Sequence, residues 1–190
     1  MAITVMFYTC WALFGAAWVA GAVVNWWKGP AVCEGSTRDR TVYVAVGAIA
    51  IATFIPASVW RHITVSDTGL RAAGAGLLLV GTAFTLWSRL ALGTMWSSGV
   101  VAREEHSLRT SGPYRVTRHP IYTGLCGMLV GSAMARELGE FAVIAVAILV
   151  SLVFKARAEE RLLLGAFPGD YERYRRHVPM FVPGLRFSRP

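Results

Sequence analysis

Charged residues are scarce in this sequence. They make up 16% of its 190 residues, while hydrophobic residues make up 55%, and soluble domains usually carry about 25% charge. This shortage argues against a soluble domain and predicts an integral membrane protein of one compact domain. The formal net charge of +8 would favour nucleic acid as the partner of a soluble protein. Because the cations here lie beside apolar segments, we expect membrane lipids as partners and no nucleic acid.

Cysteine motifs and common catalytic signatures are also missing. The three cysteines, Cys10, Cys33 and Cys126, show no CxxC or Cys/His spacing, so we expect no metal site and no disulfide framework. The sequence contains no P-loop, no HExxH and no GxGxxG that would open a βαβ unit. The first cation is Lys28, so the basic start of a signal peptide is missing, and we expect the first apolar segment to remain in the mature protein.

Long apolar runs dominate the sequence instead. They cover residues 3–27, 41–60, 70–92, 121–135 and 141–154. The first three reach the roughly 20 residues that a helix needs to cross a bilayer, whereas the last two have only about 15 each. These two predict a short helical hairpin, whose second helix continues past Lys155 into solvent. We expect an all-α integral membrane fold of five transmembrane helices, with this short C-terminal hairpin and a cytoplasmic C-terminal helical tail.

Particular residues inside the apolar runs carry further expectations. Pro56 should bend the last turns of the second run. Arg89, near the end of the third run, is expected to extend its side chain toward the membrane interface. Small residues in the third run should allow close helix approach, as they do in bilayers. They are Gly74, Ala75, Gly76 and Gly81.

Lysine and arginine are distributed unevenly between the two sides of this arrangement. If all five runs cross the membrane, fifteen of these cations lie on the side that carries residues 28–40, 103–118 and 155–190, and three lie on the other. Arg89 is left unassigned. Because cytoplasmic loops are enriched in Lys and Arg, we expect the N-terminus outside the cell and the C-terminal tail in the cytoplasm.

One long polar stretch, residues 103–122, interrupts the apolar runs. A proline restricts the residue before it to extended conformations, so Gly112 and His119 cannot lie in the middle of a helix. Pro120 suits the first turn of the helix that follows, and the unpaired amides of that turn would attract an anionic or polar ligand group. His119 and Tyr122 stand beside this candidate site. The alternative is an interfacial cap whose cations face lipid headgroups.

A second polar cluster, residues 155–163, closes the fifth apolar run. Glu159 and Glu160 project about 100° apart on a helix, so one can face inward while the other pairs with solvent or with an arginine. Lys155 shares a helix face with Glu159. An ordinary solvated helix end, with ion pairs four residues apart, is the alternative.

A third polar patch covers residues 167–179. Asp170 is expected to cap a short helix that carries Tyr171, Tyr174 and a cluster of arginines. We expect this helix to lie on the surface and its cations to hold anionic lipid headgroups. Direct contact with a ligand site is the alternative.

The order of these motifs resembles the isoprenylcysteine carboxyl methyltransferase family, which is related to the phospholipid N-methyltransferases. The shared pattern reads HxLxxxGPYxxxRHPxYxG, then an apolar hairpin, then EExxL and FxxxYxxYxxxVPxxxP. It covers residues 94–183. The resemblance implies a methyltransferase core over residues 94–190, with a donor-binding loop, the helical hairpin and the tail, and a three-span membrane scaffold over residues 1–93.

The resemblance also implies S-adenosylmethionine as the methyl donor, with no metal. The residues implied to bind the donor are His106, Ser107, Leu108, Arg109, Tyr114, His119, Pro120, Ile121, Tyr122, Glu159 and Glu160. Glu159 is also a candidate catalytic residue. The position that contacts substrate in eukaryotic relatives falls on Lys155, and Arg157 is the nearest arginine, so both are candidates for that role.

Three functions fit these observations. The leading one is methyl transfer to a lipophilic acceptor: an isoprenoid or prenyl-cysteine carboxylate, a phospholipid amine, or another isoprenoid or lipid. Methyl transfer needs alignment and a dry pocket more than strong acid-base chemistry. The second is a membrane reductase of the sterol-reductase type. The third is a non-catalytic lipid-binding protein that keeps the same scaffold.

Overall fold

The structure is a computed structural model that describes residues 1–28, 40–62, 64–93 and 108–184. Within these residues the chain is helical, and its one isolated β-bridge pairs Thr64 with Leu138. The helices are α1 (Ala2–Lys28), α2 (Arg40–Phe54), α3 (Ala57–Trp60), α4 (Thr68–Leu92), α5 (Pro120–Ala135), α6 (Glu140–Ala166) and α7 (Asp170–His177), and a 3-10 turn, η2, covers Gly112–Arg115.

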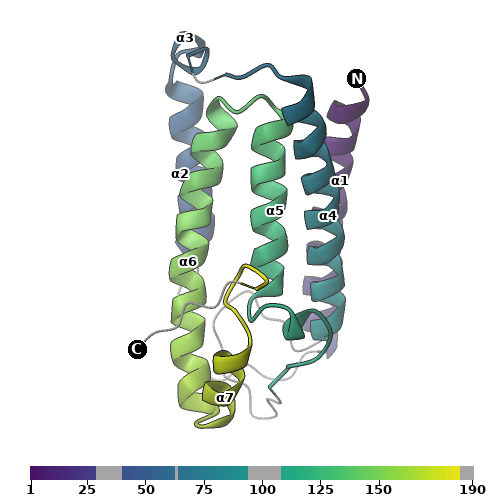
Figure 1. The fold of residues 1–190 in the computed structure, drawn as a ribbon, viewed down its shortest axis with the longest axis vertical. Helices are drawn as coiled ribbons and strands as arrows, with labels where there is room; N and C mark the ends of the chain where they lie inside the picture. The colour runs from purple at the N-terminus through teal and green to yellow at the C-terminus, as the bar shows by residue number, and fades with distance from the viewer. Residues whose placement is uncertain (29–39, 63, 94–107, 185–190) are drawn as a thin grey trace.

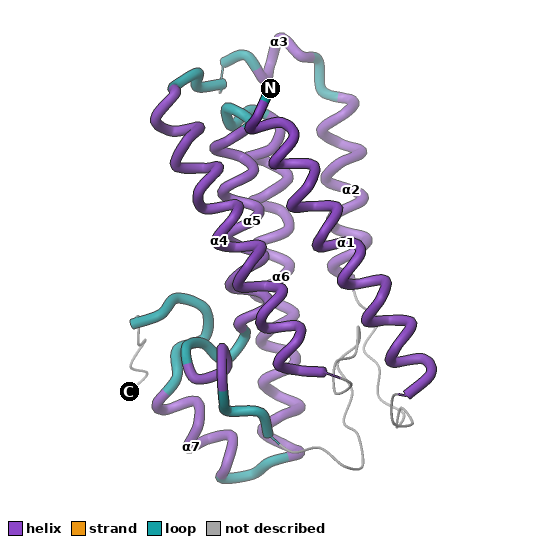
Figure 2. The backbone as a smooth tube through the Cα atoms, turned by 90° about the vertical axis from the view of Figure 1, so that its right-hand side faces the viewer, coloured by secondary structure: helices purple, strands orange, loops and turns teal. Residues whose placement is uncertain are grey.

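Five helices form an up-and-down bundle. Figure 1 shows α1, α2, α4, α5 and α6 side by side along the long axis, with the N-terminus at one end and α7 at the other. Figure 2, turned by 90°, shows the described chain as helices and loops. Because the helices alternate in direction, the first turn of α5 and the last turns of α6 lie at the same end as α7. The three polar motifs of the sequence therefore share one end of the bundle.

Three helices are long and apolar enough to cross a membrane, namely Ala2–Trp27 of α1, Thr68–Leu92 and Glu140–Ala166. The shorter apolar helices are Tyr43–Ala52, within α2, and Pro120–Ala135. An all-helical fold with membrane-spanning helices is thus confirmed. The continuation of the last apolar run beyond Lys155 is also observed, because α6 is one helix of 27 residues. The hairpin is therefore asymmetric, with a helix of 16 residues followed by this much longer one.

Two expectations about single residues are wrong. Pro56 does not bend a continuous helix, because α2 ends at Phe54 and α3 begins at Ala57. Arg89 does not reach out to the interface, because it is 7% exposed. Its Nη1 donates to the Gly93 carbonyl at 2.9 Å, and its guanidinium lies where a Cβ on Gly21 of α1 would stand. The missing side chain of this glycine lets the cation pack inside the bundle.

Helices α4 and α5 pack most closely, through glycine. A Cβ on Gly74 would lie 2.6 Å from the Ala135 amide nitrogen, and one on Gly81 would lie 2.7 Å from the Met128 amide nitrogen. Both positions confirm the expected close approach of the third run. Gly76 does not take part, because a Cβ there would meet nothing within 4 Å. The close packing of α4 fixes the position of α5, whose first turn carries the polar residues described next.

Candidate functional site

Proline sets the start of α5. His119 is the N-cap residue with φ −122° and ψ 63°, and Pro120 is the first helical residue. This agrees with the expectation that Pro120 opens the helix. Thr123 donates its amide to the His119 carbonyl at 2.9 Å, which closes the first turn. Pro113 in η2 is buried, and together the two prolines fix the path of the loop that delivers His119.

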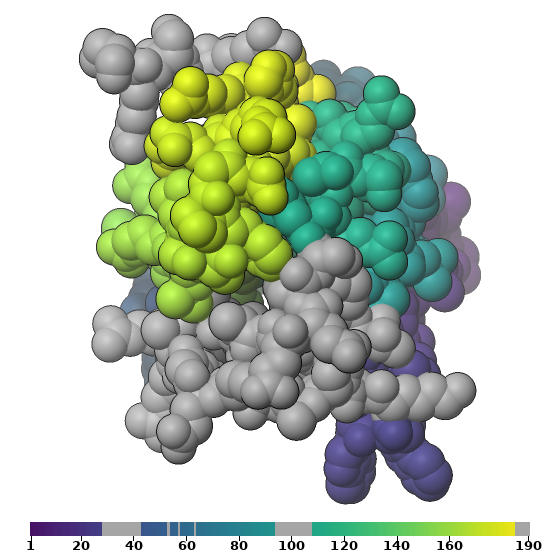
Figure 3. All heavy atoms as spheres, turned by 90° about the horizontal axis from the view of Figure 1, so that it is seen from below, coloured from purple at the N-terminus to yellow at the C-terminus, as the bar shows by residue number. Residues whose placement is uncertain are grey.

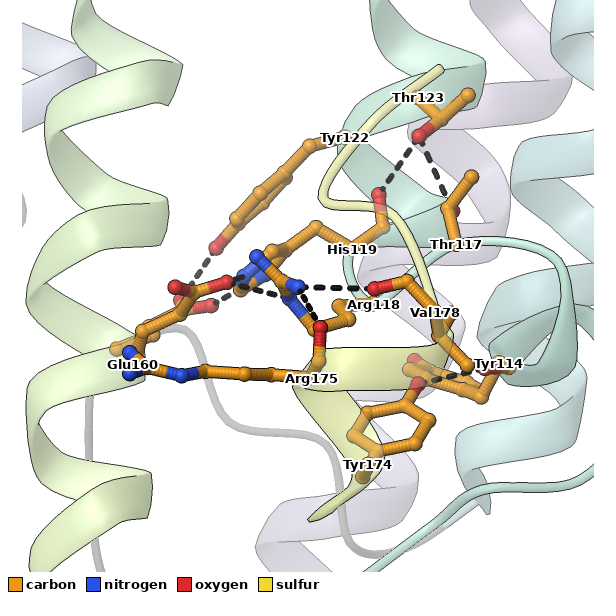
Figure 4. Close-up of polar contacts among 11 residues, drawn as sticks. Tyr114, Thr117, Arg118, His119, Tyr122, Thr123, Glu160, Tyr174, Arg175 and Val178 are labelled. Atoms are coloured by element: carbon orange, nitrogen blue, oxygen red, sulfur yellow. Dashed lines mark hydrogen bonds and ion pairs between the residues drawn. The ribbon is translucent and has the colours of Figure 1, made fainter. Parts of the chain in front are cut away.

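His119 lies between the two adjacent glutamates of α6. Its Nδ1 is 3.4 Å from Glu159 Oε2, and its Nε2 is 3.3 Å from Glu160 Oε1. Tyr122 donates its hydroxyl to Glu159 Oε1, and its ring stacks parallel to the His119 ring, with 5.6 Å between centroids. Figure 4 shows the side chains of His119, Tyr122 and Glu160 converging between the two helices. The first and second polar clusters therefore form one site.

Arg118 links this site to the tail. Its Nε donates to Glu160 Oε1 at 2.7 Å, and its Nη1 donates to the carbonyls of Arg175 and Val178, each at 2.8 Å. These carbonyls belong to the C-terminal end of α7, where a cation is favoured by the helix dipole. Both charged side chains are largely buried, at 12% exposure for Arg118 and 13% for Glu160. One guanidinium thus joins the start of α5, the end of α6 and the end of α7.

The segment after α7 runs along the start of α5. The amides of Arg118 and His119 donate to the carbonyls of Pro179 and Met180, at 2.9 and 3.2 Å. Tyr174 of α7 donates its hydroxyl to the Tyr114 carbonyl at 2.5 Å. Seen from below in Figure 3, α7 and this segment cover one side of the bundle end, against η2 and the loop before α5. The tail is therefore part of the site's walls.

The environment of these groups shifts their protonation. Burial lowers the pKa of His119, but hydrogen bonds and negative charge from Glu159 and Glu160 outweigh burial, so the pKa ends above its usual value. Burial raises the pKa of Tyr114 well above its usual range, and the charges of Tyr174 and Glu159 act in the same direction. Tyr114 therefore remains a neutral phenol, while the two carboxylates favour the protonated form of His119.

The structure brings many of the predicted site residues together. His119, Pro120, Ile121 and Tyr122 form the N-cap and first turn of α5, opposite Glu159 and Glu160. Lys155 joins this group, with its Nζ 5.7 Å from the centre of the Tyr122 ring.

The remaining predicted residues lie at the edge of this group or outside it. Leu108 and Arg109 precede η2 without helix, and Arg157 is exposed on α6. His106 and Ser107 lie outside the described residues.

Some residues of the site were not predicted from the sequence. Arg118 had no predicted role, and one of the adjacent glutamates was expected to face inward while the other pairs with solvent or with an arginine. Glu160 does pair with an arginine, Arg118. Both glutamates reach the site because His119 presents one ring nitrogen to each. The short helix on residues 170–177 is confirmed, but Asp170 is its first residue and Gly169, with φ 86°, is its N-cap. Asp170 therefore does not cap it.

Metal ligands do not gather in the part of the chain that the structure describes. No group of three or more His, Cys, Asp or Glu side chains is placed there to hold an ion. The His119 cluster has one imidazole and two carboxylates, and one oxygen of each carboxylate accepts a hydrogen bond: Glu160 Oε1 from Arg118 and Glu159 Oε1 from Tyr122. The site is therefore a hydrogen-bonded network of charged groups.

Comparison with known proteins gives the same family as the motif order. A family model described as phospholipid methyltransferase matches residues 70–169. The chain is 37% identical over 100 residues to the cobalt-zinc-cadmium resistance protein CzcN of Cupriavidus metallidurans, covering 52% of this chain and 46% of that protein. It is 31% identical over 113 residues to the protein-S-isoprenylcysteine O-methyltransferase of Schizosaccharomyces pombe, covering 57% of this chain and 47% of that protein.

A solved structure is similar as well. The fold matches the eukaryotic intramembrane Ras methyltransferase ICMT (isoprenylcysteine carboxyl methyltransferase) with a TM-score of 0.52 and 25% identity, over 76% of this chain and 50% of that chain. This chain thus spans about half the length of these relatives. The resemblance to the isoprenylcysteine carboxyl methyltransferases is confirmed. Because the family model covers more than half of the 190 residues, this chain belongs to the phospholipid methyltransferase family of membrane proteins.

Proposed function

We propose that this protein is an integral-membrane methyltransferase that moves a methyl group from S-adenosylmethionine to a lipophilic acceptor. The observation that carries the proposal is the meeting of His119 and Tyr122 with Glu159 and Glu160, from two motifs that lie about 40 residues apart in the sequence. An ordinary solvated helix end would leave these carboxylates in water. Here a buried histidine lies between them, and one of them accepts a hydrogen bond from a tyrosine.

The chemistry of the donor fits the groups in this site. S-adenosylmethionine supplies an activated methyl on a sulfonium and also carries an ammonium, a carboxylate and an adenine. Glu159, at 23% side-chain exposure, is accessible to the ammonium, and the amides of Ile121 and Tyr122 at the start of α5 suit the carboxylate. The electron-rich faces of Tyr114 and Tyr122 favour a sulfonium nearby. We assign donor binding to these residues and to Pro120, His119 and Glu160, which hold them in place.

The loop before η2 completes the donor site in this proposal. His106, Ser107, Leu108 and Arg109 are assigned to the donor on the motif order alone. Lys155 is assigned to the acceptor, because its ammonium lies over the Tyr122 ring and can attract an acceptor carboxylate. Arg157 is exposed on α6, so it is the weaker candidate for this role. Glu159 is the proposed catalytic carboxylate, through its contact with the donor.

We further propose a five-span topology with the site at the cytoplasmic end. The N-terminus lies outside, and α7 and the tail lie in the cytoplasm, as the Lys and Arg distribution indicates. Residues 1–93 form a three-span scaffold and residues 94–190 the methyltransferase core. The close packing of Gly74 and Gly81 against α5 supports one compact unit. A cytoplasmic site gives a water-soluble donor direct access, while the acceptor arrives through the bilayer.

Two acceptor classes remain under this proposal. A prenyl-cysteine or other isoprenoid carboxylate needs no base and matches the lysine beside Tyr122. A phospholipid amine needs a group that takes its proton, and His119 between two carboxylates is such a group only when it is neutral. The carboxylate is favoured, because Lys155 places a cation beside the Tyr122 ring that can attract it.

Donor binding tests the proposal. Calorimetry on detergent-solubilised protein should detect S-adenosylmethionine, and Glu159→Gln should weaken binding at least about tenfold, because a buried charged hydrogen bond contributes roughly 1.5–3 kcal/mol. Glu140→Gln is the matched control, because this glutamate is exposed at the opposite end of the same helix. Absence of donor binding to the wild type would sink the proposal. Binding of NADPH instead would favour a reductase, and binding of neither would favour a lipid-binding protein.

A further inference from the structure

Tyr171 is the largest fully buried side chain among the described residues, at 1% exposure. It lies in the first turn of α7, where its amide donates to the Phe167 carbonyl at 3.1 Å. The centre of its ring is 5.9 Å from the centre of the Tyr174 ring, one turn along the same helix. The sequence predicted a surface helix here, but this face of α7 belongs to the interior of the protein.

The hydroxyl of Tyr171 is buried and has no hydrogen-bond partner among the described residues. Its neighbour Tyr174 differs, because that hydroxyl donates to the Tyr114 carbonyl. A buried polar group without a partner is destabilising, and such groups are rare in native proteins. One explanation of such a group is a role in another state of a functional site.

The Tyr171 phenol lies beside the ion pair between Glu160 and Arg118. Burial raises the pKa of Tyr171 well above its usual range, the charge of Glu160 acts in the same direction, and the charge of Arg118 opposes it. Glu160 Oε1 accepts from Arg118 Nε at 2.7 Å and lies 3.3 Å from His119 Nε2. Figure 4 shows this carboxylate between α6 and the chain that carries Arg118 and His119. Glu160 is therefore the anionic acceptor next to the unpaired hydroxyl.

The protonation of His119 determines how many donors the two carboxylates of α6 have. A protonated imidazole donates from both ring nitrogens, which suits the contacts of Nδ1 with Glu159 and of Nε2 with Glu160. A neutral imidazole carries only one N–H, so one carboxylate then loses this donor and faces a lone pair. Glu159 retains the hydroxyl of Tyr122, and Glu160 retains Arg118. Deprotonation thus leaves one acceptor position open.

The titratable groups around His119 and Glu160 come from each element that meets at this end of the bundle. They are Arg118, Tyr122, Lys155, Glu159, Tyr171 and Tyr174. Apart from the Tyr171 hydroxyl, each of these groups already makes a hydrogen bond, an ion pair or a ring contact. The spare donor for an open acceptor position is therefore Tyr171.

We propose that Tyr171 is a positioning residue of this site, whose hydroxyl donates to Glu160 in place of His119 when the imidazole is neutral. The assignment rests on the proposed methyltransferase function, which it deepens, because the neutral imidazole leaves the two glutamates their full negative charge for a cationic donor. His119 releases its proton to solvent, and Tyr171 keeps its own proton and shares it with Glu160. Tyr171 thereby stabilises the form of the site that binds S-adenosylmethionine.

The pKa of His119 tests this role without any donor molecule. It is read from the ¹³Cε1 shifts of the four histidines in labelled full-length protein in detergent, and His119→Gln identifies the signal. Tyr171→Phe keeps the ring and removes only the hydroxyl, so the neutral form of His119 loses the group that satisfies Glu160. We expect the pKa of His119 to rise by about one pH unit, which is a tenfold change in the equilibrium. An unchanged pKa in folded Tyr171→Phe would overturn the proposal.

Two other tyrosines provide matched controls. Tyr174→Phe removes a second hydroxyl of α7, one that donates to a backbone carbonyl. Tyr43→Phe removes the hydroxyl of a residue that is 63% exposed on α2. Neither substitution should move the pKa of His119. An equal rise in Tyr174→Phe would assign the effect to the docking of α7, against a specific role of the Tyr171 phenol.

Calorimetry with S-adenosylmethionine gives a second, pH-dependent readout. Below the pKa of His119, binding must first release the proton, so Tyr171→Phe should weaken binding about tenfold, the effect of a lost hydrogen bond to a charged group. Well above that pKa the imidazole is already neutral, and the affinity should be unchanged. A loss of equal size at every pH would mean that the phenol does not act in place of His119, which contradicts the proposal.

Thermal unfolding separates this role from simple packing. Tyr171→Phe removes a buried hydroxyl that has no partner, so the unfolding midpoint should stay equal or rise. A lower midpoint, with the pKa of His119 and the donor affinity unchanged, would make Tyr171 a packing residue and reject the proposal. If the wild type binds no S-adenosylmethionine, the proposed function fails, while the pKa of His119 in Tyr171→Phe still decides whether Tyr171 acts on Glu160.

Discussion

At the scale of single residues, His119 couples pH to the site. The pKa of His119 is raised because the charges of Glu159 and Glu160 outweigh the effect of burial. The protonated imidazole therefore neutralises part of the negative charge of these glutamates, which would otherwise attract a cationic donor. When pH rises from the usual histidine value of about 6.5 through the raised pKa, His119 loses its proton. S-adenosylmethionine affinity should then increase, by up to about tenfold per pH unit for one released proton. Calorimetric titrations at pH 6 to 9 measure this dependence.

Stability should change in the opposite direction over the same range. Because the folded-state pKa of His119 is raised, its ion pairs stabilise the protein fully below the unfolded pKa, and this contribution is lost as pH rises through the folded pKa. His119→Gln should remove both pH dependences, while His177→Gln, at an exposed position on α7, should keep them. A His119→Gln variant with the wild-type pH profile would show that another group titrates.

Sequence could predict which residues in this site carry chemistry, but not all of their partners. Pro120 restricts the residue before it, which predicted that His119 precedes the helix. Because Glu159 and Glu160 are consecutive, they were predicted to lie on neighbouring faces of their helix. Arg118 could not be assigned, because its partners are carbonyls of residues 175 and 178, far along the chain. Backbone acceptors have no sequence signature. The burial of Arg89 was not predicted for a similar reason, because it depends on Gly21, which lies on another helix.

At the scale of helices, glycine determines how closely α4 and α5 approach. Gly81→Ala would place a Cβ 2.7 Å from the Met128 amide nitrogen and 2.8 Å from the Gly124 carbonyl oxygen, and backbone atoms cannot move aside without separating the helices. We expect a loss of about 1–3 kcal/mol of stability, read as a lower thermal unfolding midpoint in detergent. Gly76→Ala is the control, because nothing lies within 4 Å of its Cβ, and it should match or exceed wild-type stability by up to about 1 kcal/mol.

Hydropathy predicted the helices better than their ends. The runs at residues 3–27 and 70–92 correspond closely to α1 and α4. The last run was expected to form a short membrane helix that continues into solvent, and α6 is one continuous helix to Ala166. Charged residues after position 154 ended the apolar run without ending the helix, because Lys, Arg, Ala and Glu are all good helix formers. This continuity carries Glu159 and Glu160 from the bilayer to the polar end.

At the scale of the whole molecule, the length of α5 determines how it crosses the bilayer. Its 16 residues span about 24 Å at 1.5 Å per residue, against a hydrocarbon thickness of about 30 Å. Local thinning of the bilayer costs only fractions of a kcal/mol per Å, so a helix of this length can still cross. The turn between α5 and α6 should then lie on the same side as the N-terminus, opposite α7, as their places in Figure 1 indicate.

Single cysteines on a cysteine-free background test this topology with a membrane-impermeant maleimide on intact cells. Ala2→Cys and Glu140→Cys, both at exposed positions, should be labelled from outside. Arg173→Cys, on exposed α7 with 76% side-chain exposure, should be labelled only after permeabilisation. Labelling of position 2 but not of position 140 would mean that the hairpin enters the bilayer without crossing it. Labelling of position 173 from outside would reverse the orientation and put the donor site on the wrong side of the membrane for a cytoplasmic S-adenosylmethionine pool.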